Sequence, residues 1–182
     1  MKKEKIILGI DPGTNIMGYG VIKKTNKKIA FLCLDVILLK KFDNHHIKLE
    51  KIFKKTSEII QSFSPDEIAI EAPFFSNNAQ SMLKLGRAQG AAIIASVMHN
   101  IPIIEYAPKK IKLAITGRGQ ASKEQVAGML TNMLSIKTQP KYLDATDGLA
   151  AAVCHALQNE NSITNKKTSW SQFVKNNPNR IQ

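Results

Sequence analysis

The sequence has few cysteines, a single tryptophan and no long apolar run. Its 182 residues include two cysteines, Cys33 and Cys154, each in an apolar context without another cysteine nearby. That placement argues against a zinc site and favours buried free thiols over a disulfide. No apolar segment approaches the roughly 20 residues that cross a membrane, and the run at 6–10 is too short for a signal-peptide core. We therefore expect a soluble, cytoplasmic protein.

The sequence is also poor in acidic residues. Against 26 Lys and Arg it has 14 Asp and Glu, which gives a formal net charge of +12. This excess points to a polyanionic partner, either a nucleic acid or an acidic membrane surface, with a solvated basic surface as the plain alternative. The hydrophobic content of 43% can fill a core and excludes wholesale disorder. The length suits one domain of ordinary size.

Segments with strand and helix periodicity alternate along the chain. Three strands joined by short turns, at about 5–11, 17–23 and 29–39, predict an antiparallel meander. A strand–helix–strand order farther along implies parallel pairing. In that part the spacing predicts, in order, a helix at 49–63, a strand at 67–71, a long buried helix at 79–99, a strand at 102–106, a helix from about 123 and a last helix at 144–158. The fold class is therefore a mixed α/β sheet flanked by helices.

The end of the chain differs in composition from the rest. Residues 1–159 fit a single domain, whereas the segment 160–182 is polar and basic, with no acid after Glu160. Such a composition predicts a flexible tail.

Four of the scarce acids occur where the predicted elements would bring them to one site. Asp11 ends the first strand, Glu71 ends the strand at 67–71, and Asp144 and Asp147 open the last helix. Because Asp144 and Asp147 are three residues apart, they share a helix face. Strand ends and helix N-termini are where α/β proteins build a site beside a sheet edge. The pattern predicts a common carboxylate site.

Each of these acids also has a structural interpretation. Asp11 precedes a Pro-Gly pair and could start a turn. Asp144 could cap the last helix, and Asp147 would be favourable in its first turn. Glu71 is harder to explain in this way, because an acid that closes a buried apolar strand needs a partner.

A cluster of four carboxylates would repel itself unless cations bind. Mg²⁺ is a hard ion that takes oxygen ligands and bridges phosphates. Two such ions about 4 Å apart can activate a water molecule and stabilise the leaving oxygen of a phosphodiester. The hypothesis that follows is a site with two divalent ions, Mg²⁺ or Mn²⁺, held by Asp11, Glu71, Asp144 and Asp147.

Several short motifs contain or flank these acids. They are Gly9 to Thr14 (GIDPGT), Gly18 to Ile22 (GYGVI), Ala69 to Glu71 (AIE), Ala79 to Gly90 (AQSMLKLGRAQG), Glu105-Tyr106, Lys112 with Gly117 and Gly119, and Asp144 to Ala150 (DATDGLA). Together and in this order, over about residues 5–157, they resemble the RuvC family of bacterial Holliday-junction resolvases.

The resemblance implies a ribonuclease H-like fold and a homodimer that acts in DNA recombination and repair. Such a dimer nicks two opposing strands of a four-way DNA junction symmetrically, uses Mg²⁺ or Mn²⁺, and leaves a 5′-phosphate and a 3′-hydroxyl. A two-fold dimer suits a two-fold substrate, because it sets identical sites against equivalent strands. The resemblance also implies association with the RuvA–RuvB branch-migration complex. By motif, the catalytic and metal-binding acids fall on Asp11, Glu71, Asp144 and Asp147.

The resemblance places a DNA-contacting aromatic at Phe74, in the loop that follows Glu71. An exposed aromatic there could wedge into or stack on junction bases. Phe75 is the alternative contact, and either ring could instead pack in the core or in the dimer contact.

Three basic residues are further candidates for contact with DNA. The resemblance places Lys112 and Lys123 near the scissile phosphate. Arg118 lies between two glycines in a loop that could bring its guanidinium close to DNA, although a plain flexible connector also explains the glycines. The histidines fall outside the motifs, and we interpret them as structural or surface residues: His45, His46, His99 and His155.

Two other functions can be weighed against a nuclease. The GIDPGT motif also resembles the first phosphate loop of actin, Hsp70 and sugar-kinase ATPases, but those need a second similar domain, for which 182 residues leave no room. An ATPase would also leave Glu71 and the Asp144–Asp147 pair unexplained. A non-catalytic junction-binding module would need the basic surface but not four acids. The endonuclease is the function that the sequence favours.

Overall fold

The computed structural model describes residues 4–73, 78–137 and 142–161. Its first three strands are β1 (Glu4–Asp11), β2 (Ile16–Thr25) and β3 (Lys28–Leu38). Each pairs antiparallel with the next, so the predicted meander is confirmed. The predicted tail lies, from residue 162 onward, outside the described residues, and the domain boundary stays a prediction.

Two parallel strands complete the sheet. β4 (Glu67–Glu71) pairs with β1, and β5 (Ile103–Tyr106) pairs with β4, in the strand order β3-β2-β1-β4-β5. The sheet is therefore mixed, as the sequence predicts.

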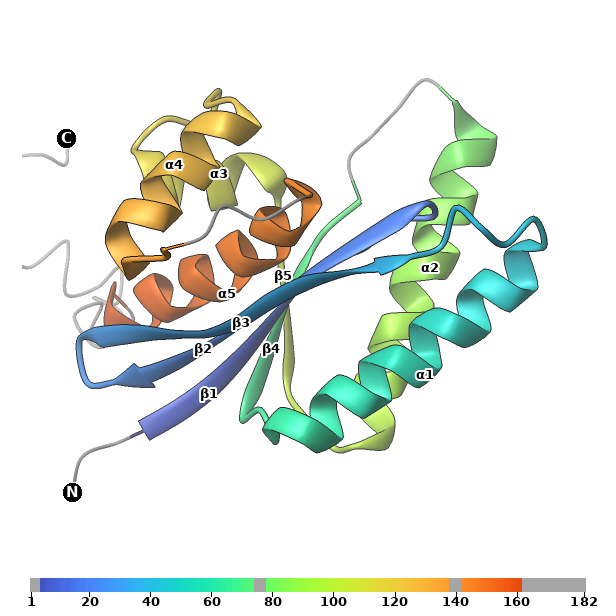
Figure 1. Cartoon of the computed structure of the whole chain (residues 1–182), viewed down its shortest axis with the longest axis horizontal. Helices are drawn as coiled ribbons and strands as arrows, with labels where there is room; N and C mark the ends of the chain where they lie inside the picture. The colour runs from blue at the N-terminus through green and yellow to red at the C-terminus, as the bar shows by residue number, and fades with distance from the viewer. Residues whose placement is uncertain (1–3, 74–77, 138–141, 162–182) are drawn as a thin grey trace, which may run out of the picture.

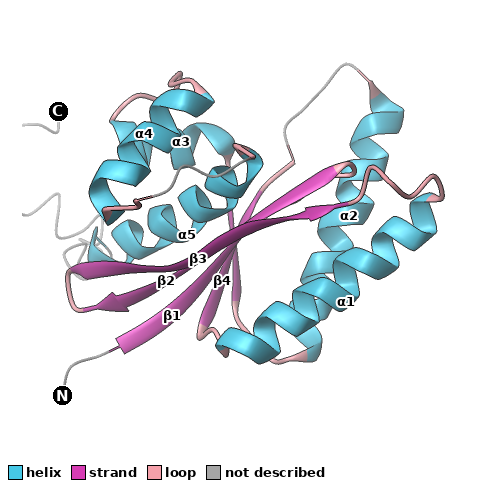
Figure 2. Cartoon of the chain, viewed as in Figure 1, coloured by secondary structure: helices cyan, strands magenta, loops and turns pink. Residues whose placement is uncertain are grey.

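Helices cover both faces of this sheet (Figures 1 and 2). On one face lie α1 (His45–Phe63) and α2 (Ala79–Met98), which pack against each other. On the other face lie α3 (Pro108–Thr116), α4 (Lys123–Leu134) and α5 (Asp144–Asn161), with α5 directly against the strands. Among the described residues, none of the helices has both the length and the apolar character that crossing a membrane requires.

Each face of the sheet has its own buried core. Ile7 and Ala69 pack on the α5 side, whereas Leu8 and Ile68 pack on the α1–α2 side. Side chains alternate between the faces along a strand. Counting in twos from Ile7 and Ala69 therefore places the last residues of β1 and β4 on the α5 side.

Helix α3 was not predicted from the sequence. Pro108 is at its start, where the missing backbone N–H costs nothing, and Gly117 ends it in the left-handed conformation with φ 72°. Ile111 and Ile115 are one helical turn apart and form its buried stripe. The helix has only 9 residues, so its two buried positions give a weak periodic signal.

The prediction that α2 is buried was wrong for the single chain. Leu83, Ile94, Val97 and Met98 have exposed fractions of 57%, 54%, 54% and 69%. The inner face of α2 is made of small residues such as Ala88, which permit close packing. Apolar residues on several sides of α2 therefore do not all belong to the core.

His155 is buried in a polar network at the far end of α5. Its Nδ1 lies 2.7 Å from the hydroxyl of Tyr106, and its Nε2 lies 2.9 Å from a carboxylate oxygen of Glu67. This setting agrees with a structural interpretation of His155. Cys33 and Cys154 are free thiols, as predicted, but only Cys154 is buried.

Candidate active site

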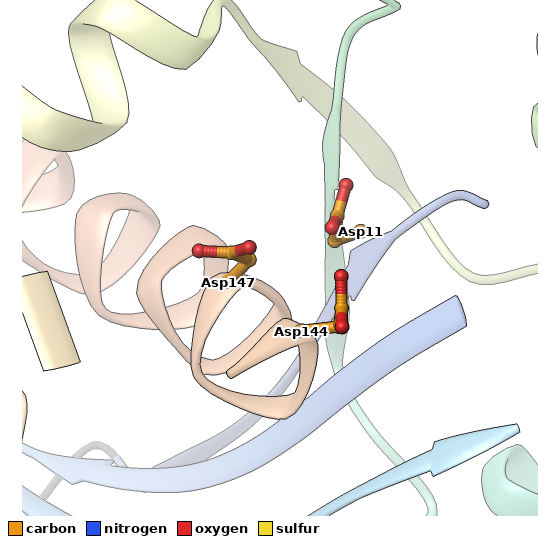
Figure 3. A group of neighbouring side chains, drawn as sticks. All are labelled: Asp11, Asp144 and Asp147. Atoms are coloured by element: carbon orange, nitrogen blue, oxygen red, sulfur yellow. The ribbon is translucent and has the colours of Figure 1, made fainter. Parts of the chain in front are cut away.

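Three carboxylates meet at the carboxyl end of β1 (Figure 3). Asp11 is the last residue of β1, and Asp144 and Asp147 lie in the first turn of α5. One carboxylate oxygen from each lies within 4.8 Å of the others. Residues from the two ends of the domain thus form one cluster.

The first turn of α5 reaches Asp11 because the backbone of α5 lies directly on the strands. A Cβ atom at Gly18 of β2 would lie 1.7 Å from the carbonyl oxygen of Asp144, and one at Gly148 would lie 2.5 Å from the Cα atom of Tyr19. Real Cβ atoms do not approach other atoms so closely, so these positions require glycine.

This role of the glycines was not predicted from the sequence, in which they were named only as parts of motifs. Gly18 and Gly20 are two residues apart and so share one face of β2. A Cβ atom at Gly20 would lie 2.5 Å from the Cα atom of Leu149. Glycines that alternate on one strand face are the signal for a close backbone approach.

Glu71 lies beside the cluster, at the end of the neighbouring strand. Because Ile10 of β1 is opposite Ile70 of β4 in a parallel pair, Asp11 and Glu71 follow at adjacent positions on the α5 side. Both line one pocket, with Pro12, Ala72, Pro73 and Leu85. Glu71 does not belong to the group of oxygens within 4.8 Å, so it adds a fourth carboxylate at the margin of the cluster.

Burial and crowding raise the pKa values of these carboxyls. Burial raises the pKa of Asp11 well above its ordinary value, and the charges of Glu71 and Asp147 raise it further. Burial and then the charge of Asp147 raise the pKa of Glu71 to about 7. Burial raises the pKa of Asp147 as well. The ionised cluster is therefore costly unless a cation lies beside it.

Lys123 places a cation at the cluster. Its ammonium group donates a hydrogen bond to Asp147 and lies 3.7 Å from a carboxylate oxygen of Asp144. Burial lowers the pKa of Lys123, but the hydrogen bond and charge of Asp147 outweigh it, and the pKa is raised. Lys123 opens α4, where Ser122 and Gln125 form a capping box. The cap thus fixes the helix start from which Lys123 reaches the acids.

The other predicted DNA contacts lie in different settings. The charge of Lys112, in α3, opposes the rise in the pKa of Glu71, so Lys112 lies within electrostatic range of this acid. Arg118 is exposed after α3, its backbone N–H donates to the hydroxyl of Thr116 at 3.1 Å, and no contact with the acids is found among the described residues. Phe74 and the neighbouring Phe75 lie outside the described residues.

The donor set suits a hard divalent cation. All three clustered side chains offer carboxylate oxygens, the ligands that Mg²⁺ and Mn²⁺ prefer. A divalent cation would also relieve the repulsion that raises the pKa of Asp11. The residues present therefore fit a divalent metal.

This mixed sheet, with carboxylates at the end of β1 and at the start of α5, defines a ribonuclease H-like protein whose acidic site suits a divalent metal. A comparison with known families gives the particular group. The model of the family described as crossover junction endodeoxyribonuclease RuvC matches residues 7–155. The chain belongs to this family, as the motifs indicate.

Individual relatives agree with the family assignment. Crossover junction endodeoxyribonuclease RuvC of Christiangramia forsetii is 57% identical over 183 aligned positions, covering 100% of this chain and 95% of the relative. The protein of the same name from Bacteroides fragilis is 56% identical, covering 99% of this chain and 97% of the relative. The similarity extends over nearly the full length of both relatives.

Solved structures share the fold. Thermus thermophilus RuvC in complex with a Holliday junction substrate superposes with a TM-score of 0.80 and 30% identity, covering 87% of this chain and 96% of that chain. The yeast mitochondrial Holliday junction resolvase has a TM-score of 0.61 and 12% identity, covering 86% of this chain and 83% of that chain. The yeast protein shows a likeness of fold alone.

Proposed function

We propose that this chain resolves Holliday junctions by nicking two opposing strands symmetrically. The single observation that carries the proposal is the group of three carboxylates within 4.8 Å in a member of the RuvC family. A relative of that family is solved in complex with a Holliday junction substrate. The acids at the site distinguish this function from that of a non-catalytic junction-binding module, which needs no carboxylate cluster.

The residues at the site divide into acids that hold metal and cations that hold phosphate. Asp11, Asp144 and Asp147 would hold Mg²⁺ or Mn²⁺, with Glu71 as a further ligand. When bound, two such ions per site would supply an activated water and stabilise the leaving oxygen of a phosphodiester, so that cutting would leave a 5′-phosphate and a 3′-hydroxyl.

The cationic side chains beside these acids would hold the strand that is cut. Lys123 is within ion-pair distance of Asp144, and the charge of Lys112 acts to lower the pKa of Glu71. Their ammonium groups would bind oxygens of the scissile phosphate. Arg118, exposed after α3, would bind a phosphate farther along the strand. Phe74 would contact a junction base.

We further propose that the active form is a homodimer. Ile94, Val97 and Met98 of α2 are more than half exposed, with fractions of 54%, 54% and 69%. An apolar stripe of this kind is suited to a second copy of the chain, because the pairing would remove it from water. The dimer would act in the cytoplasm, beside the RuvA–RuvB branch-migration complex.

The test is incubation of the purified protein with a synthetic mobile four-way junction, with Mg²⁺ or with EDTA. Wild type and Asp147→Asn are compared, with Glu58→Gln as control because Glu58 is an exposed acid in α1. We expect paired symmetric nicks from wild type and the control in Mg²⁺, and none in EDTA. Asp147→Asn should bind the junction but cut it at least about 100-fold more slowly.

Other outcomes would separate the alternatives. Tight junction binding by wild type without cutting in Mg²⁺ or Mn²⁺ would indicate a non-catalytic module. Cutting by Asp147→Asn at the wild-type rate would remove this residue from the metal site. Loss of folding in Asp147→Asn, detected by circular dichroism, would indicate that the acid has a structural role.

A further inference from the structure

Three cations gather near the start of α1 and in the first half of α2, apart from the carboxylate site. Lys48 lies in the first turn of α1, and Lys84 and Arg87 are three residues apart on α2, so they share a face of that helix. Lys84 and Arg87 are exposed, and Lys48 is partly exposed. We refer to Lys48, Lys84 and Arg87 as the α1–α2 patch.

The three side chains are close enough to act on one neighbour. α1 and α2 pack against each other on the same face of the sheet (Figure 1). His45, at the start of α1, has its pKa lowered first by burial and then by cationic groups only, which are Arg87, Lys84, His46 and Lys48. The patch therefore concentrates positive charge around His45.

Among the described residues, the patch differs from Lys54 and Lys55 of α1 in having no acidic partner. Lys54 pairs with Glu50, and Lys55 pairs with Glu58 at 3.0 Å, both on the same helix. Within the part of the chain that the structure describes, no ion pair joins a member of the patch to a carboxylate. Concentrated charge without a local counter-ion favours a polyanion as the partner.

The patch is also connected to the carboxylate site. The ammonium of Lys48 donates to the side-chain oxygen of Asn15 at 3.3 Å, and Asn15 lies in the loop that follows Asp11. Leu85, the residue after Lys84, lines the pocket that contains Asp11. The patch therefore borders this pocket from the α1–α2 side of the sheet.

Lys112 and Lys123 approach the same acids from the opposite face. They belong to α3 and α4, which lie across the sheet from α1 and α2 (Figure 1). The acids thus have cations on two sides. A strand held by Lys112 and Lys123 continues into duplex, and its next phosphates need cations beyond the pocket.

We propose that the α1–α2 patch binds backbone phosphates of a duplex arm of the junction whose strand is cut at the acids. This inference rests on the proposed function and adds to it a second surface for the same substrate. Phosphate contacts of this kind position DNA without reading its sequence. The patch thus contributes affinity and orientation, while the chemical step stays with the carboxylates.

The test measures binding of a labelled four-way junction to the full-length protein by fluorescence anisotropy in EDTA, from 50 to 200 mM salt. The variant carries Lys48→Ala, Lys84→Ala and Arg87→Ala together. Each lost phosphate contact lowers the slope of log K against log salt by about 0.9, so the triple variant should lose about 2.7. The ratio of the wild-type affinity to the affinity of the triple variant should therefore fall about 40-fold between 50 and 200 mM salt.

The matched control removes lysines from α1, the helix that carries Lys48. Lys54→Ala with Lys55→Ala takes away lysines that are paired with acids, and the slope of log K against log salt for this variant should match that of wild type. Each single substitution in the patch should lower the slope by about 0.9, which keeps the test usable if the triple variant does not fold. The single variant Lys84→Arg should bind the junction as wild type does, because it keeps the positive charge.

Two failures can be told apart. If wild type neither binds nor cuts the junction, the proposed function is wrong. If wild type cuts but the triple and single variants bind with the wild-type slope and affinity, the patch has no role in DNA binding and this inference alone is overturned. Sedimentation should show the same oligomeric state for all variants, and a changed state would contradict a direct phosphate contact.

Discussion

In the metal-free protein the Glu71 carboxyl holds its proton more tightly than an unfolded chain would. Burial and the charge of Asp147 raise its pKa from 4.5 to about 7. Between these values the native state keeps the proton that the unfolded state has lost, so the free energy of unfolding falls as the pH rises. Above pH 7 the full penalty applies, and it amounts to roughly 3 kcal/mol. The charge that suits Glu71 for metal binding thus destabilises the metal-free fold.

Replacing this carboxyl by an amide should therefore stabilise the metal-free protein at high pH. We expect Glu71→Gln to raise the free energy of unfolding by up to roughly 3 kcal/mol at pH 8, with the gain disappearing near pH 4.5. Urea denaturation in EDTA at the two pH values measures it. Glu58→Gln, at an exposed position, should show no such pH-dependent gain. A gain of equal size at both pH values would contradict the assignment to Glu71.

The contact between α5 and β2 depends on the absence of side chains at two glycines. At Gly18 a Cβ atom would lie 1.7 Å from the carbonyl oxygen of Asp144, which is backbone and can move only with the whole turn. Overpacking a core typically lowers the free energy of unfolding by about 1–3 kcal/mol. Displacement of this turn would also separate Asp144 and Asp147 from Asp11.

Gly18→Ala should therefore damage both stability and cutting. We expect a lower melting temperature and a rate of junction cutting that stays low even at saturating Mg²⁺. Thermal unfolding and the cutting assay measure the two effects. Gly128→Ala in α4 is the control, because a Cβ atom there meets nothing within 4 Å and alanine favours helix by up to about 1 kcal/mol. Equal melting temperatures for Gly18→Ala and wild type would show that α5 can shift without cost.

The regular elements were largely predictable because their signals are local. The meander and the capping box of α4 follow from residues close together in the chain. The short α3 was missed, although Pro108 and Gly117 mark its two ends. Burial of α2 was predicted wrongly, because apolar residues on several sides of a helix are equally consistent with a core and with a surface for a second chain.

The candidate site was predictable only in part. The ends of β1 and β4 and the start of α5 indicated which acids could meet, since each acid stands at the end of its own element. The meeting itself depends on the close approach of Gly18 to Asp144. The alternating glycines of β2 signal a close backbone approach, but they do not identify the residue that comes near. The ion pairs of Lys123 with the acids likewise depend on how α4 packs near α5.

The assembly proposed for this protein rests on the exposed apolar stripe of α2. A charge introduced there would be buried without a partner if two copies pair through this helix. We expect Ile94→Glu to weaken the dimer about 100-fold or more, measured by sedimentation at several protein concentrations. Leu113→Glu is the matched control, because Leu113 of α3 is 55% exposed and Ile94 is 54% exposed. Equal dissociation of both variants, or of neither, would place the dimer contact elsewhere.

During synthesis on the ribosome, two of the four acids are made early and the other two near the end of the chain. Asp11 and Glu71 leave the ribosome early, whereas Asp144 and Asp147 follow only when α5 is made. α5 also supplies buried residues to the core on its side of the sheet, including Leu149 and Val153. A nascent chain, or a fragment ended by a premature stop codon before residue 144, therefore lacks both the complete acid cluster and this core. Because of the order of the elements, an unfinished copy of this protein lacks two of the acids that we propose for cutting DNA.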